Sequence, residues 1–129
     1  MAKIFIALNL MLAPTLSGVA TYYSEAKHNG NPLYCDQFSN KKLTYNRNNE
    51  NWIAMDVGQY LSGNVQCGDK FVLLFEDGKM LEAVALDAGR FENYYVVSYG
   101  PDVPIVVDLP EHLMPKNGAA LVRALKVRE

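Results

Sequence analysis

The stretch Lys70-Phe-Val-Leu-Leu-Phe-Glu-Asp-Gly-Lys-Met-Leu-Glu-Ala-Val-Ala-Leu-Asp-Ala-Gly-Arg90 decides the fold, because it joins two apolar runs through a turn. Lys70 to Phe75 and Met80 to Leu86 each have the length and apolar content of a strand. The Asp-Gly pair between them favours a tight primed hairpin turn. Side chains alternate along a strand, so we expect one face of the second strand to carry Leu81, Ala83, Ala85 and Asp87.

Asp87 is the first candidate functional residue, because it follows this apolar run and precedes a turn at Gly89. Functional side chains are often displayed where a rigid strand ends. Desolvation by Val84 and Leu86 would favour the protonated acid, whereas Arg90 would favour the ionised form. The position predicts a catalytic acid, and the alternative is an aspartate that only caps the turn.

Shorter apolar runs separated by polar breaks make up the remainder of the chain. β-Branched and aromatic residues in these runs indicate strands. Asp56 is placed to cap one short helix, and Pro110 opens another at the first helical position, where proline is tolerated. The expected strands lie at Thr21–Tyr23, at Trp52–Met55, at Ile105–Leu109 and after Gly118, and the expected helices lie at Val57–Leu61 and Pro110–Met114.

The length and composition predict a single domain. A chain of 129 residues, 50% of them hydrophobic, can bury one ordinary core. The formal net charge of −2 argues against nucleic-acid binding, which needs a concentrated basic patch. The basic residues Arg123, Lys126 and Arg128 alternate with apolar ones, as on the outer face of a strand. No cofactor is indicated by any motif.

A targeting segment is predicted at the start of the chain. Lys3 supplies a positive charge, and the apolar stretch from Ile4 to Ala13 is broken only by Asn9. Removal of residues 1–17 would leave residues 18–129 as one mature domain, secreted or periplasmic. The stretch is too short to span a bilayer, so stable membrane insertion is not expected. The alternative is a buried N-terminal strand or helix.

The two cysteines, Cys35 and Cys67, suit a secreted protein with one disulfide bond. Free buried thiols are the alternative. The cysteines are far apart in sequence, and His28 and His112 lack the close spacing of metal ligands. We therefore predict a disulfide and no metal site.

A series of short segments carries a resemblance to a known family. Their order and spacing resemble the double-psi β-barrel domain shared by rare lipoprotein A, expansins and barwin-like proteins. The resemblance covers roughly Gly18 to Arg128. It implies a mainly β fold, a six-stranded double-psi β-barrel with one or two short helices. The segments are Gly18-Val-Ala-Thr-Tyr-Tyr-Ser24, Asn29-Gly30, Ile53-Ala-Met-Asp56, Cys67-Gly68, Asp87-Ala-Gly-Arg90, Val106-Val-Asp-Leu109 and Gly118-Ala-Ala-Leu-Val-Arg-Ala-Leu-Lys-Val127.

The resemblance also implies a binding site. In these families an acidic residue at the Asp87 position lies in an open groove that binds a polysaccharide. The same likeness places the face shared by Thr21 and Tyr23 in the groove, and Asp108 beside it as an acceptor of hydrogen bonds. The connection Phe91 to Pro104 is longer than its counterpart in most rare lipoprotein A domains. It carries three tyrosines whose rings suit sugar recognition, Tyr94, Tyr95 and Tyr99.

Two functions agree with this resemblance. The first is an exported lytic transglycosylase that cleaves peptidoglycan, with Asp87 as catalytic acid/base and Asp56 as a second acid. Asp56 stands where rare lipoprotein A has a histidine, and it can equally be a helix N-cap. Ser24 occupies the place of the second aspartate of related cellulases. The lack of that aspartate disfavours an ordinary two-carboxylate hydrolase. The alternative is a non-catalytic expansin-like or barwin-like protein that binds or loosens walls. Either protein would be a monomer whose partner is a cell-wall polysaccharide, peptidoglycan or a cellulose-like glycan.

Overall fold

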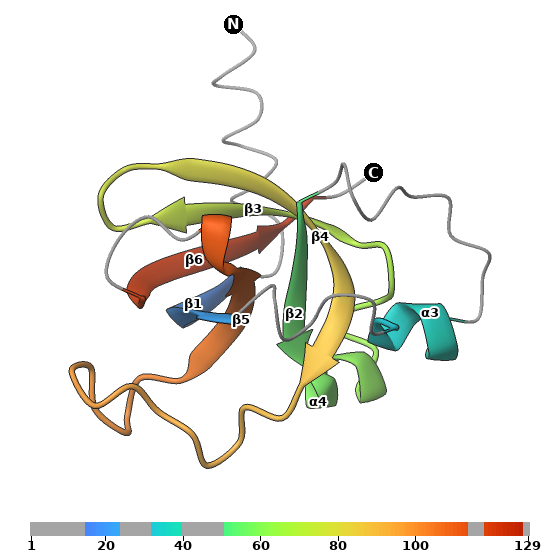
Figure 1. Ribbon diagram of the computed structural model, residues 1–129, viewed down its shortest axis with the longest axis horizontal. Coiled ribbons are helices and arrows are strands. Elements are labelled where there is room, and N and C mark those ends of the chain that lie inside the picture. The colour runs from blue at the N-terminus through green and yellow to red at the C-terminus, as the bar shows by residue number, and fades with distance from the viewer. Residues whose placement is uncertain (1–14, 24–31, 40–50, 114–117, 128–129) are drawn as a thin grey trace, which may run out of the picture.

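The computed structural model describes residues 15–23, 32–39, 51–113 and 118–127. Its elements are β1 (Thr15–Tyr23), α3 (Tyr34–Phe38), β2 (Trp52–Asp56), α4 (Val57–Leu61), β3 (Lys70–Phe75), β4 (Met80–Gly89), β5 (Ile105–Pro110), the 3-10 helix η1 (Glu111–Leu113) and β6 (Ala120–Lys126). The strands close into a barrel in the order β1-β5-β2-β4-β3-β6 (Figure 1). The pairs β1–β5 and β2–β4 are parallel, and the other neighbours are antiparallel.

This topology confirms the predicted six-stranded double-psi β-barrel. The helix over Val57–Leu61 is also confirmed, with Asp56 as its N-cap. The predicted helix at Pro110–Met114 is wrong in type, because Pro110 still belongs to β5 and only a short 3-10 helix follows it. Sequence reasoning missed α3. No helix within the described part of the chain is long and apolar enough to cross a membrane.

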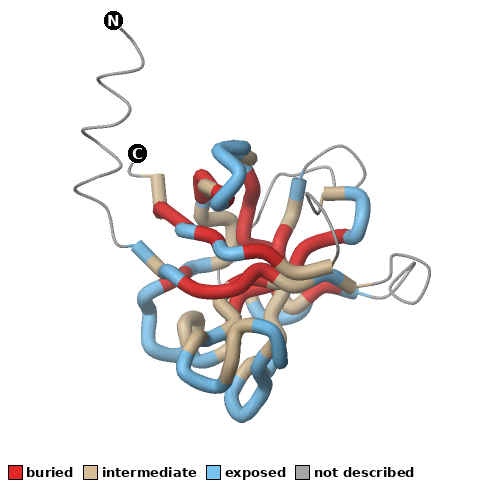
Figure 2. The backbone as a smooth tube through the Cα atoms, turned by 90° about the vertical axis from the view of Figure 1, so that its left-hand side faces the viewer, coloured by how far each residue is buried: buried red, intermediate tan, exposed pale blue. Residues whose placement is uncertain are grey.

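The core lies inside the barrel, and alternation along the strands fills it. Figure 2 shows the buried segments, in red, along the strands and the exposed ones, in pale blue, mainly at the connections. A second apolar cluster lies between β4 and α3, so β4 is buried on both faces. The barrel core includes Ala20, Ile53, Met55, Leu73, Ala83, Ala85, Val107, Leu109 and Ala124, and the second cluster comprises Leu33, Cys35, Val84 and Leu86.

The β3–β4 hairpin is confirmed, but its turn is not the predicted primed type. A primed turn on Asp-Gly needs a positive φ at Asp77, and Asn93 is the one non-glycine residue of the described chain with positive φ. Instead, the Gly78 amide donates to the Phe75 carbonyl at 2.9 Å, and Gly78 takes a φ of 91°. This is a three-residue connection, an ordinary turn followed by a left-handed glycine, which restores the register of the two strands.

Strand β1 begins three residues earlier than the expected mature start. Thr15, Leu16 and Ser17 pair with Leu125, Ala124 and Arg123 of β6. A cut after Ser17 would remove these three positions of the ladder, so a signal peptide compatible with the barrel would end before Thr15. Residues 1–14 of the predicted leader lie outside the described residues, so the leader stays a prediction.

Candidate functional site

Four residues from four strands form one row across the outer face of the barrel. Thr21 of β1 pairs with Asp108 of β5, Asp108 pairs with Ala54 of β2, and Ala54 pairs with Asp87 of β4. Their chain neighbours Ala20, Val107 and Ile53 point into the barrel core, so alternation turns Thr21, Asp108 and Ala54 outward. Asp87 lies on the same face as Ala54, with which it pairs. We call Thr21, Asp108, Ala54 and Asp87 the outer row. It brings together three of the residues predicted for the binding site.

Thr21 and Asp108 are joined directly. The Thr21 hydroxyl donates to Asp108 Oδ1 at 2.9 Å, between side chains that are both partly buried. Asp108 thus accepts a hydrogen bond from another residue of the outer row. Each side chain fixes the rotamer of the other, which leaves the second Asp108 oxygen in a defined position.

A bulge in β4 sets the direction of Asp87. Ile53 pairs with Ala85 and the next residue, Ala54, pairs with Asp87, so Leu86 is an extra residue on the β4 side. The predicted face was therefore wrong: Asp87 does not continue the face of Ala83 and Ala85, which points into the core, but lies on the outer surface. The strand also continues past its predicted end at Leu86, and the chain leaves the sheet after Gly89, as predicted.

Asp87 is held against the start of α3. Its Oδ1 accepts a hydrogen bond of 2.9 Å from the Tyr34 amide, the first residue of that helix. The first amides of a helix have no partner within the helix, so a carboxylate from another strand satisfies one of them. Asp87 therefore does act as a cap, which was the alternative to a catalytic role. It caps α3, whose Tyr34 is 53 positions away in sequence, and not a local turn.

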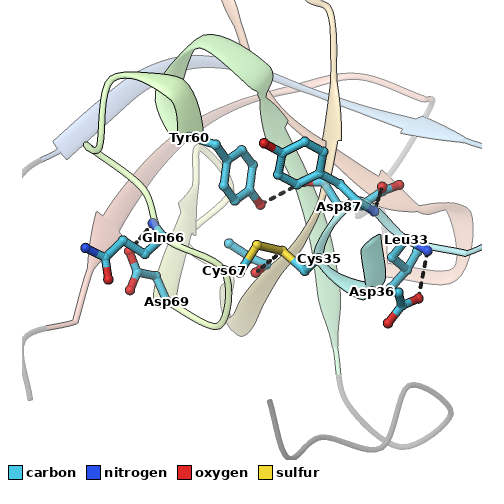
Figure 3. The surroundings of a disulfide bond; sticks show 10 residues. Leu33, Cys35, Asp36, Tyr60, Gln66, Cys67, Asp69 and Asp87 are labelled. Carbon is cyan, nitrogen blue, oxygen red and sulfur yellow. Dashed lines mark hydrogen bonds between the residues drawn. A yellow bond between two sulfur atoms is a disulfide. The ribbon is translucent and has the colours of Figure 1, made fainter. Parts of the chain in front are cut away.

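The disulfide fastens α3 beside Asp87. Cys35 of α3 and Cys67 are bonded, with Cα atoms 5.6 Å apart, which confirms the cysteine prediction. Figure 3 shows this bond next to Asp87 and Tyr60, and Leu33 lies on the same side of the barrel. Leu33 and Leu86 are fully buried in the cluster around it. The helix α3 is thus held in three ways: by the disulfide, by apolar packing and by the hydrogen bond to Asp87.

Tyr60, on α4, is a residue that sequence reasoning missed. Its hydroxyl donates to the Asp87 backbone carbonyl at 2.7 Å (Figure 3). The centroid of its ring lies 4.9 Å from that of the Tyr34 ring. Burial, together with the nearby Asp87 carboxylate, raises the pKa of Tyr60 above its usual value. The sequence did hold a signal for Tyr60. It is a large aromatic residue on the short helix that Asp56 caps, and such a side chain is expected to pack against the barrel.

We expect Tyr60→Phe to weaken the fold around Asp87. It removes the side-chain hydrogen bond to the Asp87 carbonyl and should lower the free energy of unfolding by about 1–2 kcal/mol. Because the folded-state pKa is raised, the contribution of the tyrosine is fully present below about pH 10 and is lost as pH rises further. Urea unfolding at pH 7 and above pH 10 should show the difference between parent and variant shrinking. Tyr22→Phe, at an exposed site, is the control; a difference that grew with pH would contradict the assignment.

Asp56 has both carboxylate oxygens occupied. Oδ2 accepts from the Gly58 amide at 3.0 Å as the cap of α4, and Oδ1 accepts from the Phe91 amide at 3.0 Å. It therefore ties the start of the Phe91–Pro104 connection to the end of β2. Asp56 lies two residues beyond Ala54 on β2, which places it next to the outer row and not within it.

The predicted tyrosines fall in three places. Tyr23 stacks on Trp52, the first residue of β2, with ring centroids 5.3 Å apart. Tyr94 and Tyr95 line a cavity of about 770 Å³ at the end of the barrel where β2 ends and β5 begins. Tyr99 lies elsewhere, since its hydroxyl donates to Glu76 in the β3–β4 turn at 3.2 Å. Tyr99 is thus separate from the outer row.

His112, the one histidine in the described part of the chain, does not belong to the outer row. His112 is exposed on η1. Ser24 and His28 lie outside the described residues. Trp52 was not predicted as a site residue, although alternation with the buried Ile53 turns it to the same face as Ala54.

Comparison with protein-family models and with curated proteins found no match. Among solved structures, the chain is similar to the apo form of the expansin of Clavibacter michiganensis, at 21% identity and a TM-score of 0.56, over 90% of this chain and 52% of that one. It is also similar to a mutant of that expansin in complex with cellohexaose, at 19% identity and a TM-score of 0.56, over 89% of this chain and 51% of that one. The chain spans about half the length of the expansin chains it matches. The likeness establishes a shared barrel fold.

Proposed function

We propose that this protein binds a cell-wall polysaccharide on the outer face of its barrel without cleaving it. The observation that carries the proposal is the outer row, which sets two carboxylates and a hydroxyl on one side of a rigid sheet. Carboxylate oxygens accept hydrogen bonds from sugar hydroxyl groups. The stacked rings of Tyr23 and Trp52 flank the row and add a surface for the apolar face of a pyranose.

The bonding of the acidic residues favours binding over cleavage. Asp87 accepts from α3, Asp108 accepts from Thr21, and Asp56 accepts two backbone amides. A glycan-cleaving acid must instead present a proton to the glycosidic oxygen, and the usual mechanisms need a second carboxylate free to act as base or nucleophile. Lytic transglycosylase activity through Asp87, with Asp56 assisting, is the competing function.

The glycan that we favour is a neutral β-glucan such as cellulose. The structural neighbour in complex with cellohexaose supports this choice. The disulfide is of the kind that persists in oxidising compartments, which supports an extracellular or periplasmic location. Peptidoglycan is the second candidate ligand.

Sedimentation with insoluble polymers tests the proposal. The purified parent protein is mixed with microcrystalline cellulose and, separately, with purified peptidoglycan, and the unbound fraction is measured. We expect depletion by cellulose that saturates with protein concentration. Thr21→Val keeps the shape of the side chain and removes the hydroxyl bonded to Asp108, so it should weaken the depletion. No depletion by either polymer would overturn the proposal.

A further inference from the structure

The connection from Phe91 to Pro104 displays apolar side chains that the barrel does not bury. Tyr94 is 69% exposed, Tyr95 is 50% exposed and Val97 is 86% exposed. Figure 1 shows this connection, in orange, running from the end of β4 to the start of β5. The two tyrosine rings are therefore accessible to a ligand, and an aromatic ring offers an apolar face on which a sugar can stack.

The connection is anchored at several points. The Phe91 amide donates to Asp56 at 3.0 Å, and the Val19 amide donates to the Pro104 carbonyl at 2.8 Å. Between these ends, Tyr99 is bonded to Glu76. The tyrosine pair is therefore presented by a segment with fixed attachments, which lowers the ordering cost of binding.

The lining of the cavity has the composition of a sugar site. Phe91 and the two tyrosines supply ring surface, while Gln59, Asn93 and Ser17 supply amide and hydroxyl groups. A pyranose presents both kinds of surface, an apolar ring face and a rim of hydroxyl donors and acceptors. The volume of about 770 Å³ lies in the range of small-molecule sites.

The cavity continues the outer row. Asp56 lies two residues beyond Ala54 on β2, and Val106 lies two residues before Asp108 on β5; both line the cavity. Two residues of a strand span about 7 Å. Trp52 lies two residues from Ala54 in the other direction, so the Tyr23–Trp52 stack, the outer row and the cavity follow one another along β2.

We propose that the cavity beneath the Phe91–Pro104 connection is an additional saccharide subsite, which takes further pyranose units of the same neutral β-glucan chain that crosses the outer row. Tyr94 and Tyr95 provide its stacking surface. The subsite makes affinity depend on chain length, because only a chain long enough to cover both regions contacts the tyrosines. This inference rests on the proposed function.

The test compares binding of cellotriose and cellohexaose by titration calorimetry. The double variant Tyr94→Ala, Tyr95→Ala should lose about tenfold in affinity for cellohexaose, while its affinity for cellotriose changes by less than about twofold. Tyr22→Ala is the matched control, since Tyr22 is an exposed tyrosine (47%) near the opposite end of β1 from the cavity residues Thr15 to Ser17. Both rings of the pair are exposed, so the thermal unfolding midpoint should equal that of the parent.

The possible failures are distinguishable. An equal loss for both oligosaccharides, or no loss for cellohexaose, would overturn the subsite while leaving the outer row as a binding surface. A loss of the same size in Tyr22→Ala would also overturn it. A parent protein that binds neither oligosaccharide nor cellulose would overturn the proposed function and this inference together.

Discussion

Asp87→Ala is expected to bind cellulose at least about tenfold more weakly than the parent protein. A hydrogen bond to a charged group contributes about 1.5–3 kcal/mol, and about 1.4 kcal/mol corresponds to tenfold in affinity. The substitution removes a carboxylate of the outer row and the acceptor of the Tyr34 amide hydrogen bond. The depletion isotherm with cellulose measures the effect.

Two further variants separate binding from folding. Glu82→Ala removes an exposed carboxylate from the same strand, outside the outer row, and should bind as the parent does. Asp87→Asn keeps an oxygen that can accept from the Tyr34 amide, so it should retain α3 and lose less affinity than alanine. If Asp87→Ala bound cellulose like the parent, the outer row would not be the binding surface.

Loss of the disulfide should have the largest effect on stability. Replacing Cys35 and Cys67 together with serine removes a cross-link that closes a loop of 32 positions, worth roughly 3–4 kcal/mol by chain entropy. The midpoint of urea unfolding should fall accordingly. Because Cys35 lies beside Tyr34, whose amide bonds to Asp87, the variant should also bind cellulose more weakly in the absence of urea.

The reduced parent protein is the control for this experiment. It has the native side chains without the bond, so it should unfold near the midpoint of the double variant. A decrease of less than about 1 kcal/mol in the free energy of unfolding would mean that packing of Leu33 and Leu86 alone secures α3. If the variant bound cellulose as the parent does, the disulfide would not be needed to position the binding site.

The parts of the fold that the sequence predicted depend on local patterns. The hairpin follows from two apolar runs around Asp-Gly, and the cap of α4 follows from Asp56 before a short helical segment. The disulfide prediction needed only the cysteine count and the expected compartment. These inferences draw on neighbours in sequence, where alternation and capping act directly.

The parts that failed depend on contacts between distant segments. The bulge at Leu86 reverses the direction of Asp87, and it arises from pairing with β2, which alternation along β4 cannot reveal. The cap on α3 joins Tyr34 to Asp87 across 53 positions. The strand order of the barrel decides which segments meet, so the predicted site residues are divided among three places. Thr21 and Asp108 lie in the outer row, Tyr23 lies in the stack with Trp52, and Tyr94 and Tyr95 line the cavity.

The central claim is that the barrel holds a cell-wall glycan without breaking it, and product analysis tests this most directly. The parent protein is incubated with cellulose and with peptidoglycan, and soluble material is examined by mass spectrometry. We predict protein retained on cellulose and no release of oligosaccharides from either polymer above the level of a protein-free control. Release of anhydro-muropeptides from peptidoglycan, abolished in Asp87→Asn, would contradict the account and establish a lytic transglycosylase.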